Sequence, residues 1–206
     1  MGFVTYFDLL TGLLFGLIWF GTLTFLWLKK KKSFVYLLFF TIFYVYLFKV
    51  LDYTLFQFQS LLLLKHFMPG LILQGQTAGE NMNLIPLITL TLEDLKTSVL
   101  NILLLIPFGF GLPFITNLRM KGLVVIGTLF SGIIEFLQLT TGLLANITFR
   151  IADINDVIFN TLGVVIGYIL FVGFVRICRH VFRNWKMSAN PVLQYIADRP
   201  QIDKQR

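Results

Sequence analysis

The sequence is poor in the residues that build cross-links and most metal sites. It contains one cysteine, Cys178, which excludes an internal disulfide and any cysteine-rich metal site. Its two histidines, His66 and His180, lie far apart and match no metal-ligand spacing. We therefore expect no bound cofactor and no metal.

Charged residues are also scarce. They make up 13% of the chain, against about 25% in an ordinary soluble domain. Hydrophobic residues make up 57%, and the mean hydropathy is +0.82. So much apolar surface cannot be buried in one core of 206 residues, so lipid must be the solvent. The 23 phenylalanines and 3 tryptophans suit a lipid-facing exterior with rings at the interfaces.

The predicted fold is an all-α integral membrane protein, a bundle of about five transmembrane helices. Each crossing needs roughly 20 mostly apolar residues. A weaker run, Leu55–Leu73, is interrupted by Lys65, His66 and Pro69, so we expect an interfacial or re-entrant segment there, with a sixth crossing as the alternative. The five expected spans are Leu9–Leu28, Phe34–Leu51, Val99–Ile115, Leu123–Leu139 and Val157–Val175.

The net charge of +7 is explained by topology, because the basic residues sit beside the apolar runs. We expect no nucleic-acid partner. Five crossings place ten lysines and arginines on one side, which the positive-inside tendency makes cytoplasmic, and most acidic residues on the other. The N-terminus is then outside and the C-terminus inside. The ten basic residues are Lys29, Lys30, Lys31, Lys32, Arg119, Lys121, Arg176, Arg179, Arg183 and Lys186.

The chain is expected to have four parts. Residues 1–52 hold two N-terminal membrane helices, residues 53–97 an outer loop, residues 98–177 a three-helix core, and residues 178–206 a cytoplasmic tail. The tail from Ser188 onward is short and polar, so we expect it to be disordered or to lie on the surface.

Polar residues are expected to converge near the outer ends of the last three spans. Ser131, Glu135 and Gln138 are spaced i, i+4 and i+7, on one face of the fourth span. Asn101 of the third span should lie at a similar depth. On one face of the fifth span lie Asp156, Asn160, Gly163 and Gly167, which Asp153 would extend if the helix begins early. The two glycines form a G-x-x-x-G pair that lets another helix approach, and we expect that helix to be the fourth span.

Glu135 is the most informative of these residues. A carboxylate at the centre of a membrane helix costs about 2.5–3.5 kcal/mol on insertion scales, and less near the interface, so it should face the bundle or a wet cavity. Arg150 is the nearest available cation. Such buried polar groups either form a functional site or fix the register of the helices, with Arg150 bridging the carboxylates.

Three blocks of the sequence resemble the VanZ-like family of membrane proteins. The first joins NLIP at residues 83–86 to NILLLIPFG at residues 101–109. The second is SGIIEFLQ at residues 131–138, and the third is RIADINDVIFNTLG at residues 150–163. The resemblance covers roughly residues 81–173, while the first two spans are covered only by their hydropathy.

The resemblance implies a multi-pass protein of the bacterial plasma membrane with a role in resistance to teicoplanin-type lipoglycopeptide antibiotics. An outer polar pocket would bind a membrane lipid, a lipid-linked cell-wall precursor or a lipidated antibiotic. Its acidic residues suit an amine, and Arg150 suits a phosphate or carboxylate. The candidate binding residues are Asn83, Asn101, Ser131, Glu135, Gln138, Arg150, Asp153, Asp156 and Asn160.

The alternative is a membrane-embedded enzyme. Glu135, with Asp153 or Asp156, would then serve as general acid or base, or as a metal-binding pair, on a lipid-linked substrate. No Ser–His pair is near the site. The sequence leaves open whether a reaction occurs, and it also leaves the oligomeric state open.

Overall fold

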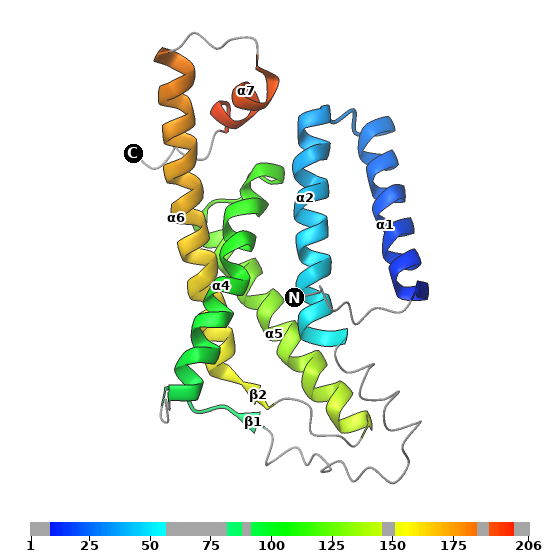
Figure 1. Ribbon diagram of the computed structural model, residues 1–206, viewed down its shortest axis with the longest axis vertical. Helices are drawn as coiled ribbons and strands as arrows, with labels where there is room; N and C mark the ends of the chain where they lie inside the picture. The colour runs from blue at the N-terminus through cyan, green and yellow to red at the C-terminus, as the bar shows by residue number, and fades with distance from the viewer. Residues whose placement is uncertain (1–8, 57–81, 88–91, 146–150, 185–189, 200–206) are drawn as a thin grey trace, which may run out of the picture.

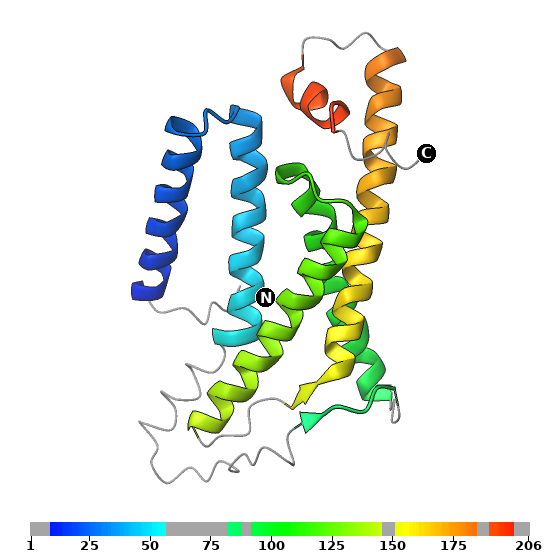
Figure 2. The same cartoon turned by 180° about the vertical axis from the view of Figure 1, so that it is seen from behind.

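The computed structural model describes residues 9–56, 82–87, 92–145, 151–184 and 190–199. Five of its helices are long and apolar enough to cross a membrane, which confirms the five expected spans. They run in alternating directions, as Figures 1 and 2 show from opposite sides. The helices are α1 (Leu9–Leu28), α2 (Phe34–Leu51), α4 (Leu92–Ile115), α5 (Met120–Ala145), α6 (Ile154–Asn184) and the short α7 (Pro191–Ala197).

Two smaller features complete the described chain. A π-helical turn, η1 (Asp52–Phe56), continues α2. Two-residue strands, β1 (Met82–Asn83) and β2 (Ala152–Asp153), pair in parallel at the end of the bundle where α4 and α6 begin. Because β2 ends at Asp153, this residue precedes α6 and does not extend its helical face.

The core lies between α4 and α6, which form the most extensive helix pair in the described chain. Their backbones approach closely because glycines line the seam. A Cβ added at Gly163 would collide with the carbonyl oxygen of Ile102, and one at Gly167 with that of Ile106. Gly109 of α4 meets the backbone of Val164 in the same way. Large apolar residues then close the core, namely Leu105, Phe108, Phe114, Tyr168, Phe171 and Val175.

The prediction that the G-x-x-x-G pair packs against the fourth span is therefore wrong. Gly163 and Gly167 pack against α4, the third span, and not against α5. Helix α5 crosses α6 through Gly127, whose small size leaves room for the side chain of Val164. Helix α4 also presents a glycine, Gly109, to α6. Both helices therefore contribute glycines to their contact, and the two backbones can approach closely.

Helix α1 lies at the edge of the bundle and touches only α2 to any extent (Figure 1). No residue of its membrane span is buried. Two side-chain hydrogen bonds hold it in place: Tyr44 Oη donates to the carbonyl of Phe15 at 2.8 Å, and Trp19 Nε1 donates to Thr41 Oγ1 at 3.3 Å.

Helix α6 is longer than the expected span. Its 31 residues extend about 46 Å at 1.5 Å per residue, which exceeds the roughly 30 Å of a hydrocarbon core. Helix α7 packs against the far end, where Arg179 donates to the carbonyls of Ala197 at 2.7 Å and Arg199 at 2.5 Å. Ile196 is buried there. The tail thus contains an ordered helix packed on the bundle, where a disordered or surface-lying end was expected.

The structure contains no membrane, so the orientation with the N-terminus outside stays a prediction. Most of the Leu55–Leu73 run lies outside the described residues, as does Arg150. The two ends of the bundle can still be told apart. The strands mark one end, and the α1–α2 loop with α7 marks the other (Figure 2).

Candidate functional site

Three polar contacts join α5 to α6 and to Asp153, the residue directly before α6, and we call them the α5–α6 ladder. Glu135 Oε2 accepts from the backbone amide of Asp153 at 3.2 Å. One turn deeper, Asn160 Nδ2 donates to Ser131 Oγ at 2.8 Å, and the hydroxyls of Thr128 and Thr161 lie 3.0 Å apart. From Glu135 to Thr128 the ladder runs about 10 Å along α5, because seven residues rise 1.5 Å each.

The carboxylate of Glu135 is held at the top of this ladder. Its side chain is buried, with a residue exposure of 9%, although it lies in an otherwise apolar span. Because α5 ends and α6 begins at the same end of the bundle, helical geometry brings the two polar faces together. The predicted convergence of Ser131, Glu135 and Asn160 is present in the structure.

The strands position Asp153 beside Glu135. Asn83 pairs with Asp153 across the two strands, and its Nδ2 donates to Asp153 Oδ1 at 3.0 Å. The same oxygen accepts from the amide of Asn155 at 2.8 Å, and Asn155 Oδ1 accepts from the amide of Leu87 at 2.9 Å. These bonds tie the segment before α4 to Asp153 and to the first turn of α6, so Asn83, Asp153 and Glu135 form one connected network.

Two buried side-chain amide atoms have no hydrogen-bond partner in the described chain. They are Nδ2 of Asn101, on α4, and Oδ1 of Asn160, on α6. Both residues are at least nine-tenths buried. Asn101 directly precedes Ile102, whose carbonyl faces Gly163, so the two amides flank one of the close contacts between α4 and α6. An unpaired buried amide costs about 1–3 kcal/mol, so such groups call for a water or a ligand.

The side chain of Gln138 makes its hydrogen bond to η1 and not to α6. Its Nε2 donates to the carbonyl of Thr54 in η1 at 2.8 Å, so it anchors the end of α2 to α5. Nearby, Lys49 and the buried Asp52 form an ion pair at 3.2 Å. The sequence does not single out Asp52 for this role, because nothing in it indicates that α2 continues as a π-helical turn.

The remaining predicted residues are placed only in part. Asp156 lies half-buried in the first turn of α6. Arg150 lies outside the described residues, so its expected position beside the carboxylates is untested. Within the described segments, no three His, Cys, Asp or Glu side chains come together as metal ligands.

Sequence reasoning missed three residues of this region. Thr128 precedes Ser131 by three positions on the same face of α5, so its helical spacing was an available signal. Thr161 carries no such signal, because it lies one position beyond the predicted face of α6. Asn155 belongs to the third sequence block, but only the structure shows that it holds the amide of Leu87.

Fold and site together define a multi-pass α-helical membrane protein with buried polar groups at one end of its bundle. The profile of the VanZ/LLP1 family matches residues 9–178, and the chain belongs to this family. The match includes α1 and α2, which sequence reasoning had covered only by hydropathy. No curated protein and no solved structure matches the chain.

Proposed function

We propose that this protein binds the polar head of a lipid-like molecule at the outer leaflet of the bacterial plasma membrane. The binding groups are four buried side chains from three helices, which we call the polar cluster: Asn101, Ser131, Glu135 and Asn160. The ligand is a membrane lipid, a lipid-linked cell-wall precursor or a lipidated antibiotic. Family membership supports a contribution to resistance against teicoplanin-type lipoglycopeptides.

The observation that carries this proposal is the pair of buried amide atoms without a hydrogen-bond partner. Asn101 offers a donor and Asn160 an acceptor, both buried and both lacking a protein partner among the described residues. A polar ligand group or a water that reaches each atom would satisfy it. A ladder built only to fix helix register would instead pair all its polar groups, as Thr128 and Thr161 do.

Glu135 supplies the charge. Its carboxylate accepts the Asp153 amide at 3.2 Å and is shielded from lipid, so it suits an amine or another cationic group of the ligand. Asp153 is already engaged by Asn83 and by the amide of Asn155. These two hydrogen bonds fix the side chain of Asp153, which gives it a positioning role.

The test is a binding measurement with the protein in lipid nanodiscs. Teicoplanin and a glycopeptide without an acyl chain serve as probes for binding. In parallel, the susceptibility of cells that express the protein is measured for each antibiotic. We expect saturable binding that requires the acyl chain. Glu135→Gln should abolish it while keeping the fold, because glutamine can still accept the Asp153 amide.

A matched control makes the same chemical change at the other end of the bundle, in Asp198→Asn beside α7. This variant should bind as the parent does. Failure of both probes and of extracted lipid-linked precursors to bind would overturn the proposal. Recovery of a chemically altered probe would instead favour the enzymatic alternative, with Glu135 as general base.

A further inference from the structure

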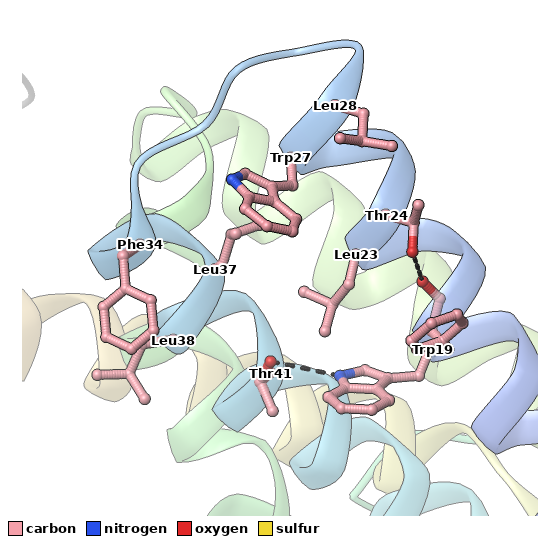
Figure 3. A pocket seen from close by; sticks show the side chains of 10 residues that line it. Trp19, Leu23, Thr24, Trp27, Leu28, Phe34, Leu37, Leu38 and Thr41 are labelled. Atoms are coloured by element: carbon pink, nitrogen blue, oxygen red, sulfur yellow. Dashed lines mark hydrogen bonds between the residues drawn. The ribbon is translucent and has the colours of Figure 1, made fainter.

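A separate apolar cavity lies at the opposite end of the molecule from the polar cluster. The cavity of about 510 Å³ opens between α1 and α2 (Figure 3). We call it the α1–α2 crevice. Its volume lies within the roughly 300–1,000 Å³ of ligand pockets. Aromatic and aliphatic side chains line it, including Trp19, Leu23, Trp27 and Leu37.

Trp19, Thr24 and Thr41, three of the residues with polar atoms in the crevice lining, are hydrogen-bonded within the protein. Thr24 Oγ1 donates to the carbonyl of Phe20 at 2.8 Å, and Thr41 Oγ1 accepts from Trp19 Nε1 at 3.3 Å (Figure 3). The walls therefore offer a ligand almost only hydrocarbon contact. An alkyl chain fits such walls, whereas a polar molecule would lose its hydrogen bonds to water.

The length of the crevice matches one leaflet. From Trp19 to Leu28 the lining of α1 extends about 14 Å, because nine residues rise 1.5 Å each. Half of a hydrocarbon core is about 15 Å. The crevice thus runs from the middle of the span to its end, as an acyl chain of that leaflet does.

Its mouth is strongly basic. Leu28 and Phe34, which line the crevice, flank a loop of four exposed lysines, Lys29–Lys32. Backbone bonds from Lys29 to Phe25 at 2.9 Å and from Lys32 to Leu26 at 3.1 Å fold this loop back onto α1. Within the described residues none of the four lysines pairs with a carboxylate.

Lys31 provides a separate indication that the charge matters. Its φ of 48° lies in the left-handed region, which glycine adopts freely and lysine adopts only at a cost. A residue chosen for the turn alone would be glycine. The chain keeps a fourth positive charge there instead.

We propose that the α1–α2 crevice binds an anionic phospholipid, with one acyl chain between the helices and the phosphate held by the lysine loop. Hydrocarbon walls, one-leaflet depth and a basic mouth each match one part of that molecule. The acyl chain would fill the space between α1 and α2. Because α1 packs on α2 alone to any extent, the lipid would help to hold α1 against the bundle.

Tryptophan quenching tests the proposal on the full chain in vesicles. The Trp185→Phe background keeps only Trp19 and Trp27, both in the crevice lining. We expect phosphatidylglycerol with brominated chains to quench more than brominated phosphatidylcholine at the same mole fraction. Lys31→Gly should weaken this preference about fivefold, since one basic residue near an anionic surface is worth about that factor. The midpoint of thermal unfolding of the Lys31→Gly variant should stay the same or rise, because glycine adopts this φ freely.

Steric variants separate a specific site from general lipid contact. Filling the crevice with Leu23→Phe and Leu37→Phe together should remove the preference. The paired control, Leu13→Phe with Leu17→Phe, changes exposed positions of α1 outside the crevice lining and should keep it. Equal quenching of the parent by both lipids would show annular lipid only, and a preference of undiminished size in Lys31→Gly would remove the lysine loop from the site. Either result overturns the proposal.

Discussion

The close seam between α4 and α6 gives a sharp prediction for Gly163→Ala. The added methyl group would overlap the carbonyl oxygen of Ile102 and would lie only 3.1 Å from its carbonyl carbon. These are backbone atoms, so no side chain can rotate away and the helices must move apart. Overpacking of this kind costs about 1–3 kcal/mol. For a chain of this size a 2 kcal/mol loss lowers the midpoint of thermal unfolding by about 4–8 °C.

The matched control is Gly132→Ala on α5. A Cβ built at Gly132 meets nothing within 4 Å, so this change adds only helix propensity, up to about 1 kcal/mol of stabilisation. Thermal unfolding of both variants in the same detergent, followed by circular dichroism, compares the two. Equal midpoints for Gly163→Ala and Gly132→Ala would refute the close backbone contact of α4 and α6.

Three further predictions concern hydrogen bonds. Ser131→Ala removes the acceptor of Asn160 Nδ2 and should cost about 1–2 kcal/mol in thermal unfolding, and no loss would mean the buried contact is absent. Tyr195→Phe removes a 2.6 Å bond to an α4 carbonyl, so limited proteolysis should cut before α7 faster than in the parent, and equal rates would contradict the docking of α7. Asn155→Ala frees the Leu87 amide, whose hydrogen exchange should accelerate about tenfold, and unchanged exchange would contradict that bond.

The sequence predicts well what depends on periodicity. Apolar runs located all five spans. The bounds of α1 and α2 match the expected ones, whereas α4, α5 and α6 extend several residues past their runs because helix can continue through polar residues. Alternating helix direction and the 3.6-residue repeat brought Ser131, Glu135 and Asn160 to one place. Both arguments use only local geometry, so they do not depend on how the bundle packs.

The sequence could not predict contacts that depend on which helices are neighbours. The G-x-x-x-G pair of α6 indicates a close approach but not the partner, and both α4 and α5 flank it. The pairing of Asn83 with Asp153 joins two-residue segments far apart in the chain, and such short strands carry no pattern. Gln138 was placed correctly on its helix, yet its partner is a main-chain carbonyl of η1, which a sequence does not mark.

The tail was underestimated for a different reason. Its polar composition suggested disorder, but the capping residue Asn190, followed by Pro191 at the start of a helix, signals a helix N-terminus. Val192, Tyr195 and Ile196 then follow helical spacing. Tyr195 stacks on Phe39 of α2 with 5.6 Å between ring centroids, so a short apolar face is enough to dock α7.

An experimental structure in lipid nanodiscs, at a resolution that shows bound water and ligand, tests the polar cluster most directly. We predict density that is not protein within hydrogen-bonding distance of Asn101 Nδ2 and Asn160 Oδ1, with Glu135 facing the same space. If the two asparagine side chains bond directly to each other and the space between α4 and α6 is dry, the polar cluster fixes only the helix register, and the proposed binding function fails.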